Sequence, residues 1–161
     1  MANLIYQKQE TAVTWQSSGG TEAFTPTSLG AAAGRQGAHH DFGTASVARK
    51  FAWRARIVPG GTRVVGEFVQ VWLKTSDGTN PDNDDGTGDI AVSSSDKLRN
   101  LLYLGTIQID ENAAVQMVVS GVVEILHRYA APIFWNATAN TLSATATDYG
   151  FSLTPVPDEI Q

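Results

Sequence analysis

The sequence predicts an all-β protein, a two-sheet antiparallel β-sandwich that is jelly-roll-like and has about eight strands. Three observations support this prediction. Apolar residues recur at every second position in the clearest segments, turn-forming residues separate most of these segments, and no stretch of about 11 residues or more shows helical periodicity. The Cys…Trp…Cys pattern of immunoglobulin domains is missing, so a jelly roll is favoured over an immunoglobulin-like Greek key.

The strongest strand signal lies at residues 50–57, where apolar side chains alternate with basic ones. A turn at Pro59-Gly60-Gly61 separates it from a second long strand at 62–75, which is apolar on both faces and therefore expected at a central place in a sheet. The other strands are expected at 11–16, 39–42, 102–109, 115–126, 133–135 and 142–153.

Two smaller features interrupt this pattern. Gly121, in the middle of a strand, predicts a bulge or a close approach of another group to the backbone. A short helical turn is expected near Ser95, with Ser94 or Ser95 as its cap and with Leu98 and Leu101 on one side.

The length of 161 residues and the absence of cysteine predict a single domain over residues 1–161 whose core needs no disulfide. Residues 17–37 contain few large apolar side chains and are expected to form a flexible loop or arm. Residues 154–161 are expected to form an extended tail along a surface, its own or a neighbour's, because Pro155 and Pro157 disfavour pairing in a sheet.

Net charge and hydrophobicity limit the kinds of partner that this chain can bind. The net charge of −5 argues against nucleic-acid binding, and no apolar run is long enough to span a membrane. No signal peptide is visible, which predicts a protein kept in a cytoplasm or released by a route other than standard secretion.

Five of the eleven basic residues fall in 49–63, and five of the sixteen acidic residues fall in 77–89. Two patches of opposite sign suit recognition of other copies or of a partner.

Catalytic and metal-binding motifs are not found. When the loop at 80–86 is placed on the EF-hand template, Val92 falls where a bidentate glutamate is required, which leaves only weak calcium binding open. His39 and Asp41 have no evident third metal ligand, and His127 has no nucleophile-elbow motif to accompany it. The sequence therefore predicts no enzyme, no cofactor and no metal.

The four tryptophans are candidates for either core packing or ligand stacking. Trp53 and Trp72 lie in the two clearest strands and are expected in the core, whereas the places of Trp15 and Trp135 stay open. An exposed tryptophan on a jelly roll would suit the stacking of a sugar.

Several stretches resemble a family of small virion proteins of tailed bacteriophages. They are Val71-Trp72-Leu73-Lys74-Thr75-Ser76-Asp77-Gly78-Thr79-Asn80 and the segments 98–107, 131–138 and 153–155. The resemblance is one of strand and turn layout, and it implies a jelly-roll domain on a phage particle. Within that family the role is most often that of a capsid cement or decoration protein on the head, and the family implies no cofactor and no catalytic residue.

This resemblance predicts a structural protein on the capsid surface of a virion, made in the host cytoplasm. It would bind the major capsid protein as a homo-oligomer and bridge neighbouring subunits. Besides residues 17–37, the expected contact residues are Arg49, Arg54, Arg56, Arg63, Val156 and Ile160. The alternative is a tail-associated or host-attachment carbohydrate-binding module.

Overall fold

The computed structural model describes residues 5–7, 10–43, 49–111 and 113–160. Within them the chain forms thirteen strands and two short 3-10 helices. Neither of these helices has the length and apolar character that a membrane-spanning helix requires. The elements are β1 (Ile5–Gln7), β2 (Val13–Gln16), β3 (Glu22–Ala23), β4 (Ala33–Gln36), β5 (His40–Asp41), β6 (Lys50–Ile57), β7 (Phe68–Ser76), β8 (Ile90–Val92), η1 (Ser95–Leu98), β9 (Leu102–Gln108), β10 (Met117–Glu124), β11 (Tyr129–Asn136), η2 (Ala146–Asp148), β12 (Tyr149–Pro155) and β13 (Asp158–Ile160).

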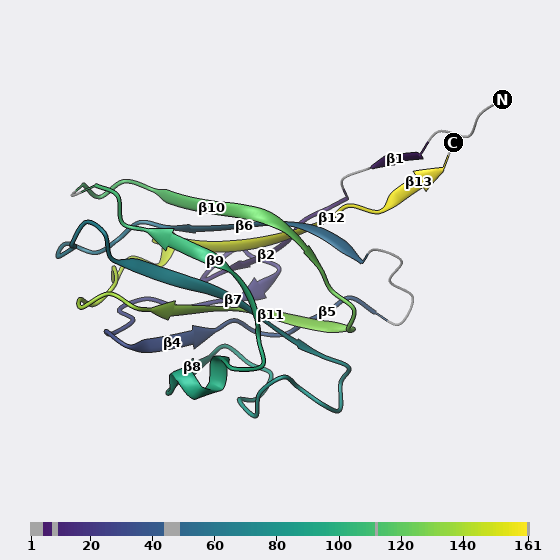
Figure 1. Ribbon diagram of the computed structural model, residues 1–161, viewed down its shortest axis with the longest axis horizontal. Helices are drawn as coiled ribbons and strands as arrows, with labels where there is room; N and C mark the ends of the chain where they lie inside the picture. Colours follow the sequence, from purple (N-terminus) through teal and green to yellow (C-terminus); the bar gives the residue numbers. More distant parts are fainter. Residues whose placement is uncertain (1–4, 8–9, 44–48, 112, 161) are drawn as a thin grey trace.

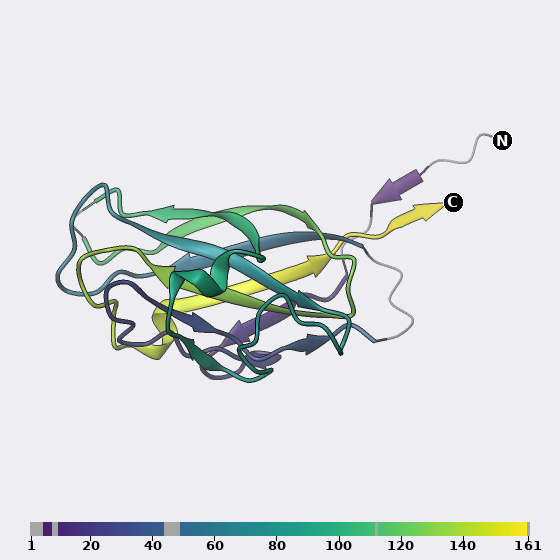
Figure 2. The same ribbon diagram turned by 60° about the horizontal axis from the view of Figure 1, so that its bottom comes forward.

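Two sheets stack as a sandwich, which confirms the predicted fold class (Figure 1). The first sheet has the order β10-β6-β12-β2-β3. The second has the order β8-β4-β11-β7-β9, and β5 also pairs with β11. Strands β1 and β13 form a separate two-stranded ribbon, which projects beyond one end of the sandwich (Figure 2).

The connectivity is that of a jelly roll. Its eight principal strands, in chain order, are β2, β4, β6, β7, β9, β10, β11 and β12. The first pairs with the eighth, the second with the seventh, the third with the sixth and the fourth with the fifth, always antiparallel. Such a chain is one long hairpin of four strand pairs, rolled into two sheets. The predicted jelly-roll-like sandwich of about eight strands is therefore correct, and β3, β5 and β8 are short additions to it.

The main core lies between the sheets and uses the alternation of the sequence. In β6 the side chains of Phe51, Trp53, Ala55 and Ile57 are buried, as the period of two predicts. Trp15, on β2, is completely buried in the same core. Its indole nitrogen keeps a partner there, because it donates a hydrogen bond of 2.7 Å to the carbonyl oxygen of Ala38.

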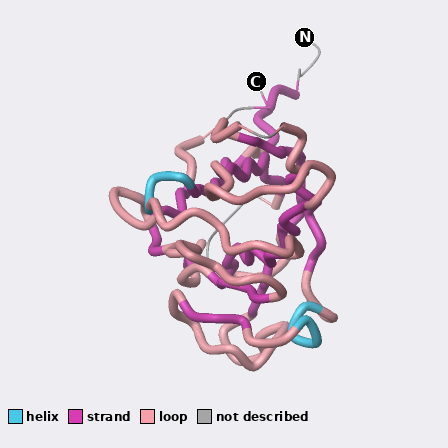
Figure 3. Tube along the Cα trace, turned by 90° about the vertical axis from the view of Figure 1, so that its left-hand side faces the viewer, coloured by secondary structure: helices cyan, strands magenta, loops and turns pink. Residues whose placement is uncertain are grey.

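A second, smaller core covers the outer face of the second sheet. It consists of Val92, Leu98, Leu101, Ile133 and Trp135. Helix η1 holds Leu98 in place, and the side chain of Ser94 caps it by accepting a hydrogen bond from the backbone N–H of Asp96, so the predicted helical turn is confirmed. The tube in Figure 3 shows both 3-10 helices as short segments at the edges of the strand layers.

Trp72 corrects one expectation, because it is only half-buried and packs against this second core. On β7 the side chains of Val69, Val71 and Leu73 point into the main core, so Trp72 points to the outer face. There its ring lies 4.8 Å from that of Tyr103, measured between centroids.

The expected strand at 62–75 begins later than predicted, at Phe68. Val64 and Val65 are about half exposed in the preceding loop, where Gly66 has a φ of +96° and turns the chain. The strand expected at 142–153 likewise begins only at Tyr149. Apolar residues alone therefore did not fix where these strands start.

The segment expected as a flexible loop or arm and the segment expected as an extended tail both contribute residues to the sandwich. Residues 17–37 contain β4, which pairs with β11, and Phe24, which is completely buried in the main core. At the other end, Thr154 and Pro155 pair with β6, and only β13 leaves the sandwich. Pro155 is tolerated because the next backbone bond to β6 is donated by the N–H of Val156, to the carbonyl oxygen of Lys50, and not by the proline nitrogen.

Gly121 confirms the predicted close approach. It lies opposite Trp53 in the β6–β10 ladder, whose register is continuous and shows no bulge. A Cβ atom at this position would lie 2.9 Å from the indole nitrogen of Trp53, so only glycine leaves room for the ring.

Candidate functional site

The first candidate surface is the outer face of the first sheet along β6 and β10. The ladder places Arg56 opposite Val118 and Arg54 opposite Ser120. Arg54 is exposed, and the side chains of Val118 and Val122 are 39 % and 60 % exposed. We call this surface the open face, and it consists of Ala52, Arg54, Arg56, Val118, Ser120 and Val122.

The basic residues expected to form a contact surface do not all belong to the open face. Arg56 lies on it and is fixed, since it donates a hydrogen bond of 2.9 Å to the carbonyl oxygen of Thr147. Arg49 is exposed directly before β6. Arg63 belongs instead to the loop between β6 and β7, where its Nε donates to the carbonyl oxygen of Gly60 at 2.9 Å.

The two apolar residues expected in the contact surface, Val156 and Ile160, lie in different parts of the structure. Val156 is only 9 % exposed, and its backbone N–H donates to the carbonyl oxygen of Lys50 at 2.9 Å. It is therefore part of the domain's own packing. Ile160 pairs with Ile5 in the ribbon of β1 and β13.

This ribbon is the second candidate surface. Its strands pair with each other over three residues each and form a sheet of their own, away from the sandwich (Figures 1 and 2). An isolated two-stranded ribbon is at best marginally stable in water. Contact with another surface would therefore stabilise it.

The third candidate region is the loop of residues 77–89, which is fastened to the second sheet by a buried lysine. Lys74, on β7, is 1 % exposed and donates hydrogen bonds to the carbonyl oxygens of Asp85 and Gly86. Burial lowers the pKa of Lys74, and the carboxylate of Asp85 opposes that shift. Gln36 holds the same loop, because its Nε2 donates to the carbonyl oxygens of Gly86 and Gly88 at 3.0 and 3.1 Å.

The carboxylates of this loop make bonds within the domain, so the region is more than a solvated acidic loop. Asp82 accepts hydrogen bonds from the backbone N–H and the hydroxyl of Thr75, at 2.6 and 2.8 Å. Asp89 accepts from Nε of Arg35 at 2.6 Å. The side chains of Lys74 and Gln36 place the loop on the second sheet, whereas the open face belongs to the first sheet. The patches of opposite charge thus lie on different sheets.

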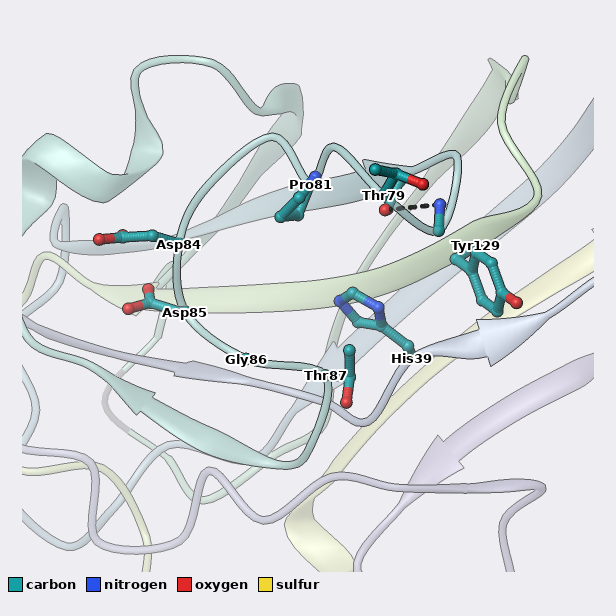
Figure 4. A pocket seen from close by; sticks show the side chains of 10 residues that line it. His39, Thr79, Pro81, Asp84, Asp85, Gly86, Thr87 and Tyr129 are labelled. Carbon is teal, nitrogen blue, oxygen red and sulfur yellow. Dashed lines mark hydrogen bonds between the residues drawn. The ribbon is translucent and has the colours of Figure 1, made fainter.

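A cavity of about 560 Å³ lies between this loop and the start of β11 (Figure 4). The residues His39, Thr79, Asp84, Asp85, Thr87 and Tyr129 line it, and the carboxylates of Asp84 and Asp85 point away from His39 in Figure 4. Two buried side-chain atoms of these residues, Nε2 of His39 and Oδ2 of Asp85, have no hydrogen-bond partner within the described chain. Burial and the nearby charge of Lys74 lower the pKa of His39 to about 4, so this imidazole is neutral at pH 7.

The remaining histidine arrangements do not match known catalytic or metal geometries. The hydroxyl of Thr75 donates to Asp82 and lies 2.9 Å from Nδ1 of His127. The hydroxyl therefore lies between the carboxylate and the histidine, whereas in a catalytic triad the histidine lies between the carboxylate and the hydroxyl. Asp41 is occupied by two hydrogen bonds of 2.6 Å from Arg128 and is not shared with His39. Residues 5–7, 10–43, 49–111 and 113–160 contain no group of three potential metal ligands among His, Cys, Asp and Glu.

The tryptophans offer little exposed surface, since Trp15, Trp53 and Trp135 are at most 8 % exposed and Trp72 is half-buried. The cavity could not be predicted from the sequence, because its wall joins His39 and Tyr129 to a loop remote from both in the chain. The only signal for it was the unusual density of Asp, Asn, Thr and Gly in residues 77–89.

Three regions are thus candidates for function: the open face, the ribbon and the cavity beside the 77–89 loop. Their interpretation depends on geometry and on the chemistry of the side chains. Comparison of the sequence with protein-family models and with curated proteins finds no match.

Proposed function

We propose that this chain is a bacteriophage virion structural protein, a capsid cement or decoration protein that binds the outside of the head. It would contact the major capsid protein as a homo-oligomer and bridge neighbouring subunits on the capsid surface after synthesis in the host cytoplasm. The observation that carries the proposal is the ribbon of β1 and β13, which forms a sheet separate from the sandwich. The resemblance of residues 71–80 and of the later segments to phage virion proteins is the reason for proposing a phage head as the particle that this chain binds.

The ribbon has backbone hydrogen-bonding groups on its outer edges that another chain could pair with. Each of its two strands is paired on one side only, in a sheet that consists of β1 and β13. The unpaired edges present backbone N–H and C=O groups that can extend a sheet of another chain. A subunit of the shell or a second copy of this chain would satisfy these groups and stabilise the ribbon.

The open face supports the same proposal as a second contact area. Arg54 and Arg56 carry positive charge beside the exposed apolar side chains of Val118 and Val122. Burial of such a mixed surface across a subunit boundary adds binding free energy, which rupture of the shell must overcome. The charged groups would set the orientation of docking.

A structural role also agrees with the chemistry of the described residues. The Thr75, Asp82 and His127 side chains form a hydrogen-bonded chain in the wrong order for nucleophilic catalysis. We therefore propose a protein that is not an enzyme and that acts through binding alone.

The test uses phage heads prepared without this protein and the purified chain. Deletion of residues 158–161 removes β13 and should abolish cosedimentation with the heads, while the melting temperature of the free protein stays unchanged. Deletion of residue 161 alone keeps every pair of the ribbon and serves as the matched control. Equal binding by both deletions would contradict the role of the ribbon, and binding of the intact chain to tails instead of heads would contradict the proposed location.

A further inference from the structure

We propose that a second copy of this chain pairs with the free edge of β10, across a two-fold axis at Ser120. The first sheets of the two copies, with five strands each, would then join into one sheet of ten strands. This inference rests on the proposed function, because it identifies the contact that makes the homo-oligomer. The open face and the ribbon would remain available for the head.

The first argument comes from the edges of the two sandwich sheets. Within the described residues these sheets end in β10, β3, β8 and β9, and β10 borders the sandwich in Figure 1. β3 and β8 have only two and three residues, and a bulge breaks the register of β9 with β7. β10 has eight residues in continuous register with β6 and contains neither proline nor lysine. It therefore lacks the features by which edge strands usually avoid pairing with another chain.

The second argument comes from the backbone groups of this edge. The N–H of Ile125 donates to the carbonyl oxygen of Arg49 at 2.8 Å and continues the ladder of β10 and β6. Hydrogen-bonded pairs alternate along an antiparallel ladder, so the odd-numbered residues of β10 bond to β6. The N–H and C=O groups that point away from β6, and that no described strand pairs with, belong to Val118, Ser120, Val122 and Glu124.

The third argument comes from the side chains, which match across a two-fold axis. Val118, Ser120 and Val122 all lie on the exposed side of β10. In an antiparallel pair centred on Ser120, Val118 lies opposite Val122 of the second copy, and Ser120 lies opposite its own counterpart. A displacement by two residues in either direction would place Ser120 opposite a valine. The matching of side chains therefore selects the axis at Ser120.

Charge is compatible with this contact. β10 contains one charged residue, Glu124, which would lie opposite Gln116 of the second copy. The two Glu124 residues would lie at opposite ends of the paired strands. Arg54 lies opposite Ser120 in the ladder with β6. The Arg54 residues of the two copies would be three strand spacings apart, about 14 Å, which exceeds the screening length of about 8 Å in physiological salt.

The size of the contact sets the expected affinity. An eight-residue strand pair buries less than the roughly 1,200–2,000 Å² of a standard stable interface. We therefore expect a weak dimer of the free protein and stronger association when two copies bind one head, because the head raises their effective concentration. The joined sheet would also present two open faces side by side to the shell.

The first test is sedimentation equilibrium of the full chain at about 10 μM to about 1 mM, a range that covers weak interfaces. We expect an equilibrium of monomer and dimer. Val122→Lys should raise its dissociation constant by at least about tenfold, because lysine on an edge strand opposes pairing. Val65→Lys is the matched control and should leave the constant unchanged, since Val65 is similarly exposed but lies in the loop before β7.

The second test locates the axis with cysteine, which the chain lacks. Only a residue on a two-fold axis lies opposite itself, at a Cα separation of about 5.5 Å in a hydrogen-bonded pair, which a disulfide can bridge. The two copies of residue 118 would instead be more than about 13 Å apart along the strands. Ser120→Cys should therefore form a covalent dimer at least about tenfold faster than Val118→Cys under mild oxidation, as measured on non-reducing gels.

Three results would overturn the proposal. The first is a chain that stays monomeric up to about 1 mM. The second is an equal effect of Val122→Lys and Val65→Lys on the dissociation constant, and the third is equal crosslinking of Ser120→Cys and Val118→Cys. None of these measurements uses phage heads. A dimer that does not bind heads would contradict the proposed function and leave this contact standing, whereas a monomer that binds heads would do the reverse.

Discussion

The ammonium nitrogen of Lys74 lies 3.2 Å from Oε1 of Gln36, and both side chains are buried beneath the loop of residues 77–89. Together they bind the carbonyl oxygens of residues 85, 86 and 88. This pair links β7 and β4 to a loop that lacks regular secondary structure for most of its length. The loop therefore keeps a defined shape, and with it the cavity.

Replacement of Lys74 by methionine should destabilise the domain. The variant removes the donors to the carbonyl oxygens of Asp85 and Gly86 and leaves these groups unpaired, which costs roughly 2–4 kcal/mol in the free energy of unfolding. Urea denaturation followed by circular dichroism measures the loss. Lys50→Met, at the first residue of β6, is the control and should change stability by less than about 0.5 kcal/mol. Equal stability of the two variants would mean that the buried ammonium does not hold the loop.

His39 should make stability depend on pH. Its pKa is about 4 in the folded protein, below the ordinary value of 6.5, so the unfolded chain binds more protons between these values. Stability is therefore fully present above pH 6.5 and falls as the pH drops toward 4, by up to about 3 kcal/mol. His39→Gln should flatten this part of the profile in urea denaturation at several pH values. A variant that keeps the full slope would assign the pH dependence to other groups.

Two nested truncations should separate the ribbon from the core. Deletion of 158–161 removes only β13 within the described chain and should leave the melting temperature unchanged. Deletion of 154–161 also removes two pairs of the β6–β12 ladder and the buried side chain of Val156. That should cost about 2–4 kcal/mol. Thermal denaturation compares the two, and an equally small effect would show that Val156 contributes nothing to the core.

Gly121 should not tolerate a side chain. In Gly121→Val the new Cβ would lie 2.9 Å from the indole nitrogen of Trp53, and displacement of the ring should cost about 1–3 kcal/mol. Gly61→Val is the control, because a Cβ at Gly61 meets no atom within 4 Å. Both variants are compared by thermal denaturation and by the fluorescence of the tryptophans. Similar melting temperatures would contradict the tight packing of Trp53 on the strand.

Charge reversal on the open face should weaken binding to phage heads. Arg54 is exposed between β10 and β12, so Arg54→Glu should reduce the affinity by about tenfold without loss of stability. Arg99→Glu is the matched control, since Arg99 has a side chain that is 76 % exposed and follows η1, outside the first sheet. Cosedimentation with heads gives both affinities. If Arg99→Glu has the larger effect, the docking surface lies on the second sheet.

The sequence by itself determined the fold class and several local elements. The alternation in residues 50–57 identified β6 and its buried face, because a strand places successive side chains on opposite sides. Ser94 and the spacing of Leu98 and Leu101 identified the helical turn, and Gly121 indicated a close approach that proved to be the ring of Trp53. These features depend on near neighbours in the chain, which is why a sequence pattern can report them.

Only the tertiary structure decided which strands face which partners and what the loops cover. The sequence around Trp72 and Lys74 does not show how deeply either side chain is buried. The half-burial of Trp72 and the full burial of Lys74 depend on where residues 77–101 fold back over the second sheet. The cavity likewise needs His39 and Tyr129 to meet residues 79–87, a contact between segments far apart in the chain. Such long-range pairings follow from the global packing of the jelly roll, because burial, pKa and hydrogen bonding depend on distances in space that local periodicity does not specify.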